Sequence, residues 1–410
     1  MIKSTKSSLL FANTNRLENL FSFIAEYRNV VSRFVETLWS QDKIPALLPK
    51  ETTKTIDSWL TARAIQCAGK QASGIVRGVR KKQSKRKFMI DKFIETKQFK
   101  KARKLQKIYD EISISKPDVD NVEPELDSRF VKIDLENDTT FDGWITLSSL
   151  GNKFKVELPF KKHKHFNKML SNGKLKKGIR LSKKNITFMF EIAEPKMIET
   201  GSILGIDIGQ KTTLSCSNGQ MIGKDSHNHD YSSICKKLSI KKKDSKGFKR
   251  TEKHRTNYIH WSVNQLNLTG IKQVNRENIV GLRKGRNTSR LMKHWNYAEL
   301  FDKLDSKLCN AGVQINKVSP TYTSQRCSSC GWVRKGNRKK KEFKCDKCGF
   351  ATDADLNAST NLSLSLMPIG KQQRLSKINK TGFYWLCSSQ ESIVPDARKT
   401  LSIENFQYKK

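Results

Sequence analysis

The chain has 410 residues, more than one ordinary hydrophobic core accommodates, so two or three domains are expected. It carries 79 lysines and arginines against 39 aspartates and glutamates, a formal charge of +40 that disfavours an isolated compact fold and suits a protein that binds a polyanion. A lipid surface is one such polyanion, but the sequence contains no run of about 18 apolar residues, and no signal peptide is expected. Nucleic acid is therefore the favoured partner, rather than a membrane.

The first part of the chain is predicted to be helical after one strand at 3–12. Apolar residues recur at three- and four-residue spacing from Leu17 to Leu38, and again over 55–79, which indicates two amphipathic helices. A basic helical region follows over 77–107. A run of charges is usually only a solvated face, but the nearly uniform sign here favours a helix that faces nucleic acid. The candidate contacts in this region are Arg80, Lys81, Lys82, Lys85, Arg86 and Lys87.

A linker with two prolines is expected at 114–125, and after it the hydrophobic period becomes two. Short strands are predicted at 130–135, 143–147, 153–159 and 186–192. Their number and spacing predict a small β-barrel. If the preceding helices are an insertion in that barrel, the strand at 3–12 lies beside strands of residues 129–196.

From residue 201 the pattern changes again. An apolar strand at 202–209 contains one acid, Asp207. Asn218-Gly219 is a strong signal for a hairpin turn, and it separates two further predicted strands at 212–217 and 220–223. This part of the chain is therefore expected to be an α/β domain that begins with an antiparallel meander.

A long helix is expected over 232–266, and it is densely basic in its first half. Lys241, Lys242 and Lys243 in this helix are further candidate contacts to nucleic acid. The segment 271–282 that follows is predicted to be a strand that ends in an acid, Glu277.

Three carboxylates are candidates for a metal centre: Asp207, Glu277 and Asp355. Each also has an ordinary explanation, because an acid at a strand end is often a turn residue, a glutamate is usually on the surface, and Asp353 or Asp355 can cap the helix predicted at 358–366. The alternative is that the three converge to hold a pair of hard divalent cations, which need oxygen ligands and leave positions for water and phosphate. The residues alone leave both interpretations open.

Four of the nine cysteines form a metal-binding pattern. Cys327 and Cys330, and Cys345 and Cys348, are two Cys-x-x-Cys-Gly knuckles separated by fourteen residues. Four thiolates at this spacing predict a closed tetrahedral zinc site with a structural role, and a redox motif is disfavoured because two matched knuckles are present. The odd total and the scatter of the other five cysteines suit a reducing cytosol rather than a disulfide framework.

The segment between the two knuckles is almost entirely basic. If the zinc site holds it rigidly, its cations would be presented to nucleic acid; otherwise the hairpin only holds the fold. The candidate contacts are Arg334, Lys335, Arg338, Lys339 and Lys340.

The order of these motifs resembles the TnpB family, proteins encoded by prokaryotic insertion sequences and related to compact type V CRISPR effectors. The resemblance rests on Gly205-Ile-Asp207-Ile-Gly209, then Glu277, then Thr323-Ser324-Gln325-Arg326-Cys327 with its knuckle, and finally Asp355-Leu-Asn357-Ala358. It covers residues 200–365 well and earlier residues only in organisation. Arg276 departs from the family, which usually has an apolar residue there.

The resemblance implies a RuvC-type, RNase H-like nuclease with an inserted zinc ribbon. Asp207, Glu277 and Asp355 would be its catalytic residues and would bind two Mg²⁺ ions, while the four cysteines would bind one structural Zn²⁺. Guide RNA and target DNA are the implied partners, a transposase encoded nearby is a further one, and the oligomeric state stays open. The implied location is the cytoplasm of a prokaryote.

The expected fold class is therefore mixed, with an α/β nuclease domain preceded by a small β-barrel that carries an all-α insertion. The predicted parts are the first barrel (wedge) strand at 1–12, a helical recognition domain at 13–112, a linker at 113–128, the rest of the barrel at 129–199, the first nuclease part at 200–319, the target-binding zinc ribbon at 320–352, the last nuclease part at 353–366 and a C-terminal extension of unknown role at 367–410.

The predicted function is RNA-guided DNA cleavage beside a short flanking motif. The alternatives are a guided DNA-binding repressor without cleavage, a type V CRISPR effector rather than a transposon-encoded protein, and a strand transferase or unguided resolvase on the same fold. The presence of all three acids favours an active nuclease.

Overall fold

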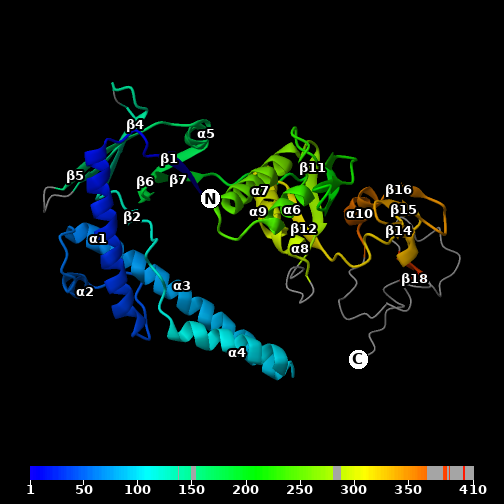
Figure 1. Cartoon of the computed structure of the whole chain (residues 1–410), viewed down its shortest axis with the longest axis horizontal. Helices are drawn as coiled ribbons and strands as arrows, with labels where there is room; N and C mark the ends of the chain where they lie inside the picture. The colour runs from blue at the N-terminus through cyan, green and yellow to red at the C-terminus, as the bar shows by residue number, and fades with distance from the viewer. Residues whose placement is uncertain are drawn as a thin grey trace. The chain divides into compact units, whose positions relative to one another are not determined.

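The computed structural model describes residues 1–136, 138–148, 154–279, 288–366, 382–385, 387 and 400–401. The chain divides into two compact units, Met1–Ala193 and Glu194–Lys410 (Figure 1). Most of the extension predicted at 367–410 lies outside the described residues.

Four helices follow the first strand of the first unit: α1 (Thr14–Trp39), α2 (Lys50–Lys54), α3 (Ala62–Glu95) and α4 (Phe99–Ile114). The Asn13 side chain accepts a hydrogen bond from the Arg16 amide and starts α1, whose apolar face is buried as predicted. The second predicted helix begins later than expected, because Thr61 caps α3 at residue 62. The basic region is two helices rather than one, since Lys97 adopts a left-handed backbone (φ 53°) between α3 and α4.

The first unit also contains two antiparallel sheets. Their strands are β1 (Ile2–Ser8), β2 (Glu125–Leu126), β3 (Val131–Asp134), β4 (Gly143–Ser148), β5 (Lys155–Phe160), β6 (Gly173–Leu181) and β7 (Asn185–Ile192). A further helix, α5 (Lys164–Asn172), lies between β5 and β6 in the chain. One sheet has the order β1-β7-β6-β2 and the other β3-β4-β5. Because β1 pairs with β7 along its whole length, the predicted placement of the first strand beside the later strands is confirmed.

The second unit is built on a mixed five-stranded sheet. Its strands are β8 (Ser202–Ile208), β9 (Leu214–Cys216), β10 (Met221–Ile222), β11 (Ile271–Glu277) and β12 (Gln314–Val318), in the order β10-β9-β8-β11-β12. The predicted antiparallel meander of β8, β9 and β10 is confirmed, while β8, β11 and β12 are parallel. The helices of this unit are α6 (Tyr231–Ile240), α7 (Lys246–Gln265), α8 (Arg290–His294), α9 (Tyr297–Asn310) and α10 (Ala354–Ser363).

The single helix predicted at 232–266 is wrong, because α6 and α7 are separate. Asp244 adopts a left-handed backbone (φ 65°) that an α-helix cannot contain, and the Ser245 hydroxyl then accepts a hydrogen bond from the Phe248 amide at 3.1 Å, which starts α7. The last helix also begins earlier than predicted, at Ala354, because the Asp353 carboxylate accepts hydrogen bonds from the amides of Asp355 and Leu356.

Short strands complete the second unit. A three-stranded sheet contains β14 (Arg338–Lys339), β15 (Glu342–Lys344) and β16 (Ala351–Asp353), and a second one contains β13 (Trp332–Val333), β17 (Phe383–Trp385) and β18 (Thr400–Leu401). The C-terminal segment therefore returns to the cysteine-rich region, since Phe383 and Tyr384 pair with Val333 and Trp332.

Helix α10 packs directly on β8 at Gly205. A Cβ atom added there would overlap the carbonyl oxygen of Ser359 and approach the amide nitrogen of Ser363 to 2.5 Å. We expect Gly205→Ala to lower the free energy of unfolding of this unit by about 1–3 kcal/mol or more, because the helix must move away from the strand. Urea unfolding measures the loss. Gly247→Ala in α7 is the matched control, since its nearest neighbour is the flexible end of Lys241 at 4.0 Å; an equal loss in both variants would contradict the packing argument.

Candidate active site

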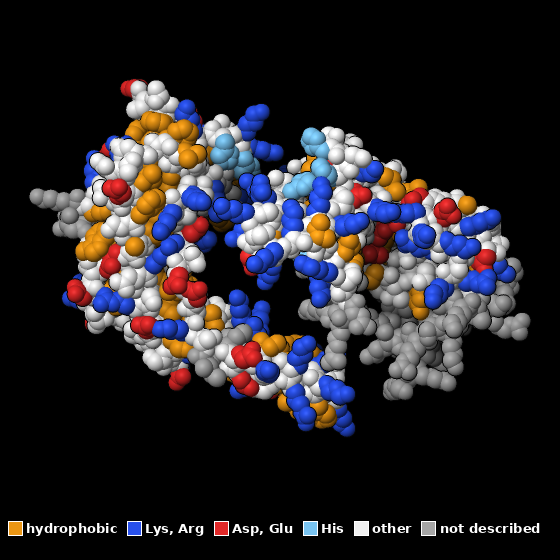
Figure 2. Space-filling view, in the orientation of Figure 1, with side chains coloured by type: hydrophobic (Ala, Val, Ile, Leu, Met, Phe, Trp, Pro, Cys, Tyr) orange, Lys and Arg blue, Asp and Glu red, His pale blue; other side chains and the backbone are white. Residues whose placement is uncertain are grey.

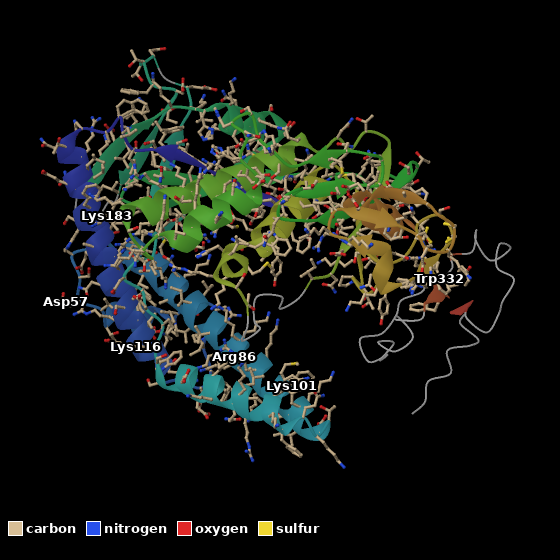
Figure 3. All side chains as sticks on the ribbon, turned by 45° about the vertical axis from the view of Figure 1, so that its right-hand side comes forward. Asp57, Arg86, Lys101, Lys116, Lys183 and Trp332 are labelled. Carbon is tan, nitrogen blue, oxygen red and sulfur yellow. The ribbon has the colours of Figure 1, made fainter. Side chains whose placement is uncertain are left out.

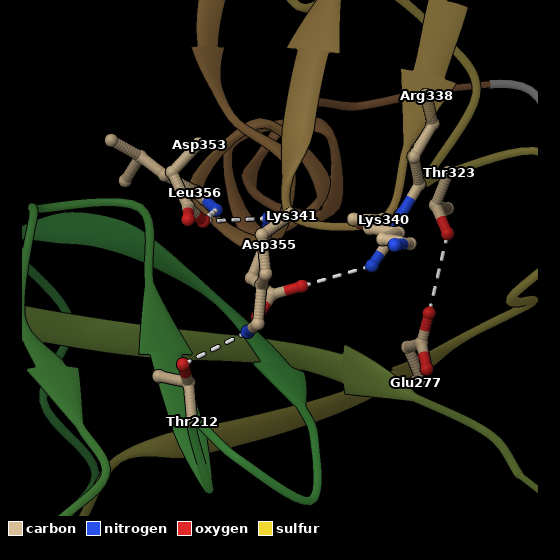
Figure 4. Close-up of polar contacts among 9 residues, drawn as sticks. All are labelled: Thr212, Glu277, Thr323, Arg338, Lys340, Lys341, Asp353, Asp355 and Leu356. Atoms are coloured by element: carbon tan, nitrogen blue, oxygen red, sulfur yellow. Dashed lines mark hydrogen bonds and ion pairs between the residues drawn. The ribbon is translucent and has the colours of Figure 1, made fainter. Parts of the chain in front are cut away.

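Asp207 and Glu277 lie side by side at the carboxyl ends of two neighbouring parallel strands. Ile206 of β8 is in register with Arg276 of β11, so the next residue on each strand is an acid, and the two acids face the same side of the sheet. Glu277 is 9% exposed and Asp207 is partly buried. The hydroxyl of Thr323 donates a hydrogen bond to Oε1 of Glu277 at 3.2 Å, which fixes that carboxylate (Figure 4).

Asp355 comes to the same place from the first turn of α10. It is 5% exposed and forms ion pairs with two cations of the segment between the cysteine knuckles. Nη2 of Arg338 lies 3.0 Å from Oδ1, and Nζ of Lys341 contacts Oδ2 and also donates to the Thr212 hydroxyl at 3.0 Å (Figure 4). Because Thr212 follows β8 closely in the chain, these contacts bring Asp355 next to the strand that carries Asp207.

The surroundings of Asp207 and Glu277 favour the protonated forms of the two carboxyl groups. Burial, and after it the charge of Glu277, raise the pKa of Asp207 to about 8, although the charges of Arg338 and Lys341 act in the opposite direction. Burial also raises the pKa of Glu277 to about 7, against the hydrogen bond from Thr323 and the charge of Arg338. Buried carboxylates with such raised pKa values are costly to ionise without a cation, which is the property expected of a metal centre.

These pKa values predict how the metal-free protein responds to pH. Between about pH 4, where the unfolded carboxyls ionise, and about pH 8, the folded protein holds protons that the unfolded chain has released. Folding then takes up protons, so the contribution of this pair to the free energy of unfolding falls as pH rises through that window. We expect Asp207→Asn to raise the melting temperature at pH 8 in Mg²⁺-free buffer and to change it little near pH 4, which thermal melts across the range measure. An increase in melting temperature that does not depend on pH would contradict the raised pKa of Asp207.

The residues fit divalent metal ions. Three carboxylates supply hard oxygen ligands, as Mg²⁺ requires, and two of them have raised pKa values that a cation would reverse. Arg338 was predicted to contact nucleic acid, and Lys341 was not singled out. In the structure both form ion pairs with Asp355. Their position next to the acids could not be found from the sequence, because it depends on how the ribbon folds back.

Arg276, which departs from the family pattern, packs against α9 on the face of β11 opposite to Glu277. Its guanidinium forms a bidentate ion pair with Asp305 of α9, at 2.8 and 2.6 Å, and lies 4.0 Å from the ring centroid of Phe301. Since successive side chains of a strand point to opposite faces, this contact leaves Glu277 directed toward the other acids.

The four cysteines of the two knuckles meet at one point. Sγ of Cys327 lies 3.7 Å from that of Cys348, and Sγ of Cys330 lies 3.7 Å from that of Cys345. Thiolates on a tetrahedral Zn²⁺ with bonds of about 2.3 Å are about 3.8 Å apart. The predicted four-thiolate cluster is therefore present, and it is compatible with a zinc ribbon.

Buried polar side chains connect this ribbon to α10. Arg326 and Asn357 belong to the motifs that carry the family resemblance, but their contacts, and the part that Asn361 plays, were not predicted. Arg326 is fully buried; its Nη1 donates to Oδ1 of Asn361 at 2.6 Å and its Nε donates to the Trp385 carbonyl. Asn357 accepts a hydrogen bond from the Ser328 amide and donates to the Arg326 carbonyl. Asn357 and Asn361 are four residues apart on one face of the helix, so the Asp-x-Asn motif links the acid Asp355 to the cysteine knuckle.

The predicted nucleic-acid contacts fall into two groups. The exposed ones are Lys81, Lys82, Lys85, Lys87, Lys242, Lys243, Arg334, Lys335, Lys339 and Lys340. Of these, Arg334 forms an ion pair with Asp346. The others are half-buried: Arg80 donates to the Trp39 carbonyl and lies 4.7 Å from its ring centroid, and Lys241 donates to the Thr251 hydroxyl at 2.6 Å. Arg86 on α3 is half-buried (Figure 3).

Exposed basic side chains are spread over both units (Figure 2). Basic side chains of the second unit also line a pocket of 660 Å³ beside the α6–α7 turn. Lys241, Lys243, Arg255, Arg290 and Lys293 contribute to it, against two acids, Asp244 and Glu252. Such a pocket suits an anionic group. None of the helices among the described residues combines the length and apolar character that crossing a membrane requires.

Comparison with known proteins identifies the relatives of this chain. Residues 297–362 match the family model described as Cas12f1-like, TNB domain. The chain is 36% identical over 118 residues to the CRISPR-associated endodeoxyribonuclease Cas12f1 of Sulfoacidibacillus thermotolerans, which covers 28% of this chain and 27% of that protein. It is 34% identical over 94 residues to a TnpB-like protein of Aquifex aeolicus, covering 21% of this chain and 30% of the relative.

Among solved structures, the mini-RNA-guided endonuclease CRISPR-Cas_phi3 aligns with a TM-score of 0.51 at 10% identity, over 88% of this chain and 92% of that one. That likeness establishes the fold. The aligned segments span less than a third of the two curated relatives named above. The resemblance to TnpB-like proteins predicted from the motifs is confirmed by these matches.

Proposed function

We propose that this chain is an RNA-guided DNA endonuclease that hydrolyses a phosphodiester of target DNA with two bound Mg²⁺ ions. The observation that carries the proposal is the convergence of Asp207, Glu277 and Asp355, which are distant in sequence, at the ends of β8 and β11 and the start of α10. Guidance by RNA is supported by the name of a relative in Escherichia coli, the putative RNA-guided DNA endonuclease InsQ, to which 84 residues of this chain are 38% identical. DNA cleavage is supported by the CRISPR-associated endodeoxyribonuclease among the relatives.

In this proposal Asp207, Glu277 and Asp355 hold the metal ions. Bound Mg²⁺ would supply the activation of water and the stabilisation of the leaving oxygen. Thr323 orients the Glu277 carboxylate by its hydrogen bond. Arg338 and Lys341 neutralise Asp355 and place two cations where a phosphate would enter. Attack of water in line with the leaving oxygen gives a 5′-phosphate and a 3′-hydroxyl.

The other parts have proposed roles in binding. The four cysteines would hold one structural Zn²⁺, and the ribbon would present Lys335, Lys339 and Lys340 to target DNA. The two sheets of the first unit would form the wedge barrel, and α1 to α4 the recognition domain that holds the guide scaffold. The basic side chains would contact the backbone of the guide–target duplex, since base pairing carries the sequence specificity. A transposase encoded nearby is a further proposed partner, and the proposed location is the prokaryotic cytoplasm.

The test begins with the RNA that co-purifies with the protein. Sequencing it identifies the constant scaffold and the variable guide segment. The guide segment is then replaced, and the reconstituted complex is incubated with Mg²⁺ and DNA containing either the old or the new target beside a randomised flank. We expect cleavage to follow the new guide and to depend on one flanking motif.

Two results would overturn the proposal. Cleavage by RNA-free protein would indicate an unguided resolvase or transferase. Guided binding without cleavage would indicate a repressor. The same DNA lacking the target sequence is the control for both.

A further inference from the structure

A second group of metal-ligating side chains lies outside the proposed nuclease centre and the cysteine ribbon. Asp225 and His229 belong to the loop between β10 and α6, and His254 belongs to α7. One ligand atom from each of the three side chains lies within 4.8 Å of the others. Figure 2 shows histidine side chains gathered on one part of the second unit's surface.

The loop that carries Asp225 and His229 is held in one conformation by its own backbone. The Asp225 amide donates to the His229 carbonyl at 3.0 Å, and the Asn228 amide donates to the Asp225 carbonyl at 2.9 Å, with Asn228 in a left-handed conformation (φ 61°). Oδ1 of Asp225 accepts hydrogen bonds from the amides of His227 and His229, both at 2.9 Å. The other oxygen, Oδ2, is therefore directed to the side chain of His229.

Helix α7 presents His254 to this loop. Tyr258, one turn after His254 and on the same face of the helix, donates a hydrogen bond from its hydroxyl to the Gly223 carbonyl. The same hydroxyl lies 2.8 Å from Oγ1 of Thr213. These bonds hold α7 against the start of the loop, and the rings of His229 and His254 meet edge to face with centroids 4.9 Å apart.

The side chains of Asp225 and His229 are too far apart for a good hydrogen bond, but their separation is close to that of two ligands on one metal ion. Oδ2 of Asp225 lies 3.6 Å from Nδ1 of His229, and that nitrogen is buried without a hydrogen-bond partner among the described residues. A hydrogen bond of this type is normally below about 3.2 Å. Two ligands of a tetrahedral ion with bonds of about 2.1 Å are about 3.4 Å apart.

We propose that Asp225, His229 and His254 bind one divalent transition-metal ion, with Zn²⁺ as the expected species. Two imidazole nitrogens and one carboxylate oxygen suit Zn²⁺ or Ni²⁺ and do not suit Mg²⁺, which prefers oxygen ligands. The site thus differs in chemistry from both the carboxylate centre and the four-thiolate cluster. Three protein ligands leave a fourth position for water, and the ion ties the β10–α6 loop to α7.

Titration of Ni²⁺ by calorimetry tests the site. The protein is used with its ribbon loaded with Zn²⁺ and in excess Mg²⁺, so that the other two centres are the same in every variant. We expect one Ni²⁺ equivalent in the parent protein, weakened at least about tenfold in His254→Ala and in His229→Ala, which is about 1.4 kcal/mol or more. Zn²⁺ added first should block the Ni²⁺ uptake.

His227→Ala is the matched control, because His227 lies in the same loop with its ring centroid 6.3 Å from that of His229 and is outside the ligand set. It should bind Ni²⁺ as the parent does. Ni²⁺ should also raise the melting temperature of the parent and of His227→Ala but not of His254→Gln, a variant that keeps side-chain volume. The proposal is overturned if the parent binds no more Ni²⁺ than His254→Gln does, or if His227→Ala loses as much binding as His254→Ala.

Discussion

Replacing Asp207 by alanine is expected to abolish guided DNA cleavage while RNA and DNA binding are retained. Asp207 lies at the end of the central strand, next to Glu277, in a site whose burial raises the pKa values of both acids. Removing its carboxylate takes away one of the three proposed metal ligands, so we expect the rate to fall on the order of 10³-fold or more, about 4 kcal/mol of transition-state stabilisation. Single-turnover cleavage measures the rate, and gel-shift binding of matched DNA measures affinity.

The control for this variant is Asp302→Ala, which removes an exposed acid from α9 in the same unit. It should leave both rate and affinity unchanged. Glu277→Gln keeps the shape of the side chain and should also abolish cleavage. Undiminished cleavage by Asp207→Ala, or an equal loss of DNA binding, would show that the carboxylate does not act in the chemical step.

Replacing Cys345 by serine is expected to abolish the zinc binding proposed for the ribbon and to inactivate the protein. Cys345 is buried, and its Sγ lies 3.7 Å from that of Cys330. The apolar cluster around the ribbon is small, with Trp332, Phe343 and Ala354 as its buried members besides two cysteines among the described residues. The proposed Zn²⁺ would therefore supply most of the local stability, since structural zinc typically contributes about 10 kcal/mol or more of binding free energy.

The loss should extend to the active site, because the ribbon and α10 are connected by Asn357 and Asn361, and Asp355 contacts Arg338 and Lys341 of the ribbon. Zinc content by mass spectrometry and the cleavage rate measure the two effects. Cys309→Ser is the matched control, since Cys309 is an exposed cysteine on α9 outside the cluster. A zinc-free Cys345→Ser protein that still cleaves at the parent rate would separate the ribbon from the chemistry.

Local sequence patterns predicted the long elements well and the breaks poorly. The apolar spacing of α1 indicated its face because each contact lies within a turn or two. The break between α6 and α7 was missed, since it depends on Asp244 adopting a left-handed backbone and on the Ser245 cap. Strand β6 was not predicted because Lys174, Lys176 and Lys177 obscure its alternation, which becomes clear only when β7 pairs with it.

The three acids and the four cysteines also differ in how far local sequence determines their arrangement. The sequence by itself determined the cysteine cluster, because two residues between paired thiolates and a glycine after them specify a knuckle through local geometry alone. It also determined which acids were candidates. Only the tertiary structure decided that these acids meet, since that depends on the pairing of β8 with β11 and on the packing of α10 over Gly205, between residues some 70 to 150 positions apart. The tertiary structure also decided that Arg276 pairs with Asp305, away from the three acids, and that Arg338 and Lys341 pair with Asp355. Charges that are distant in sequence interact only after the chain has folded.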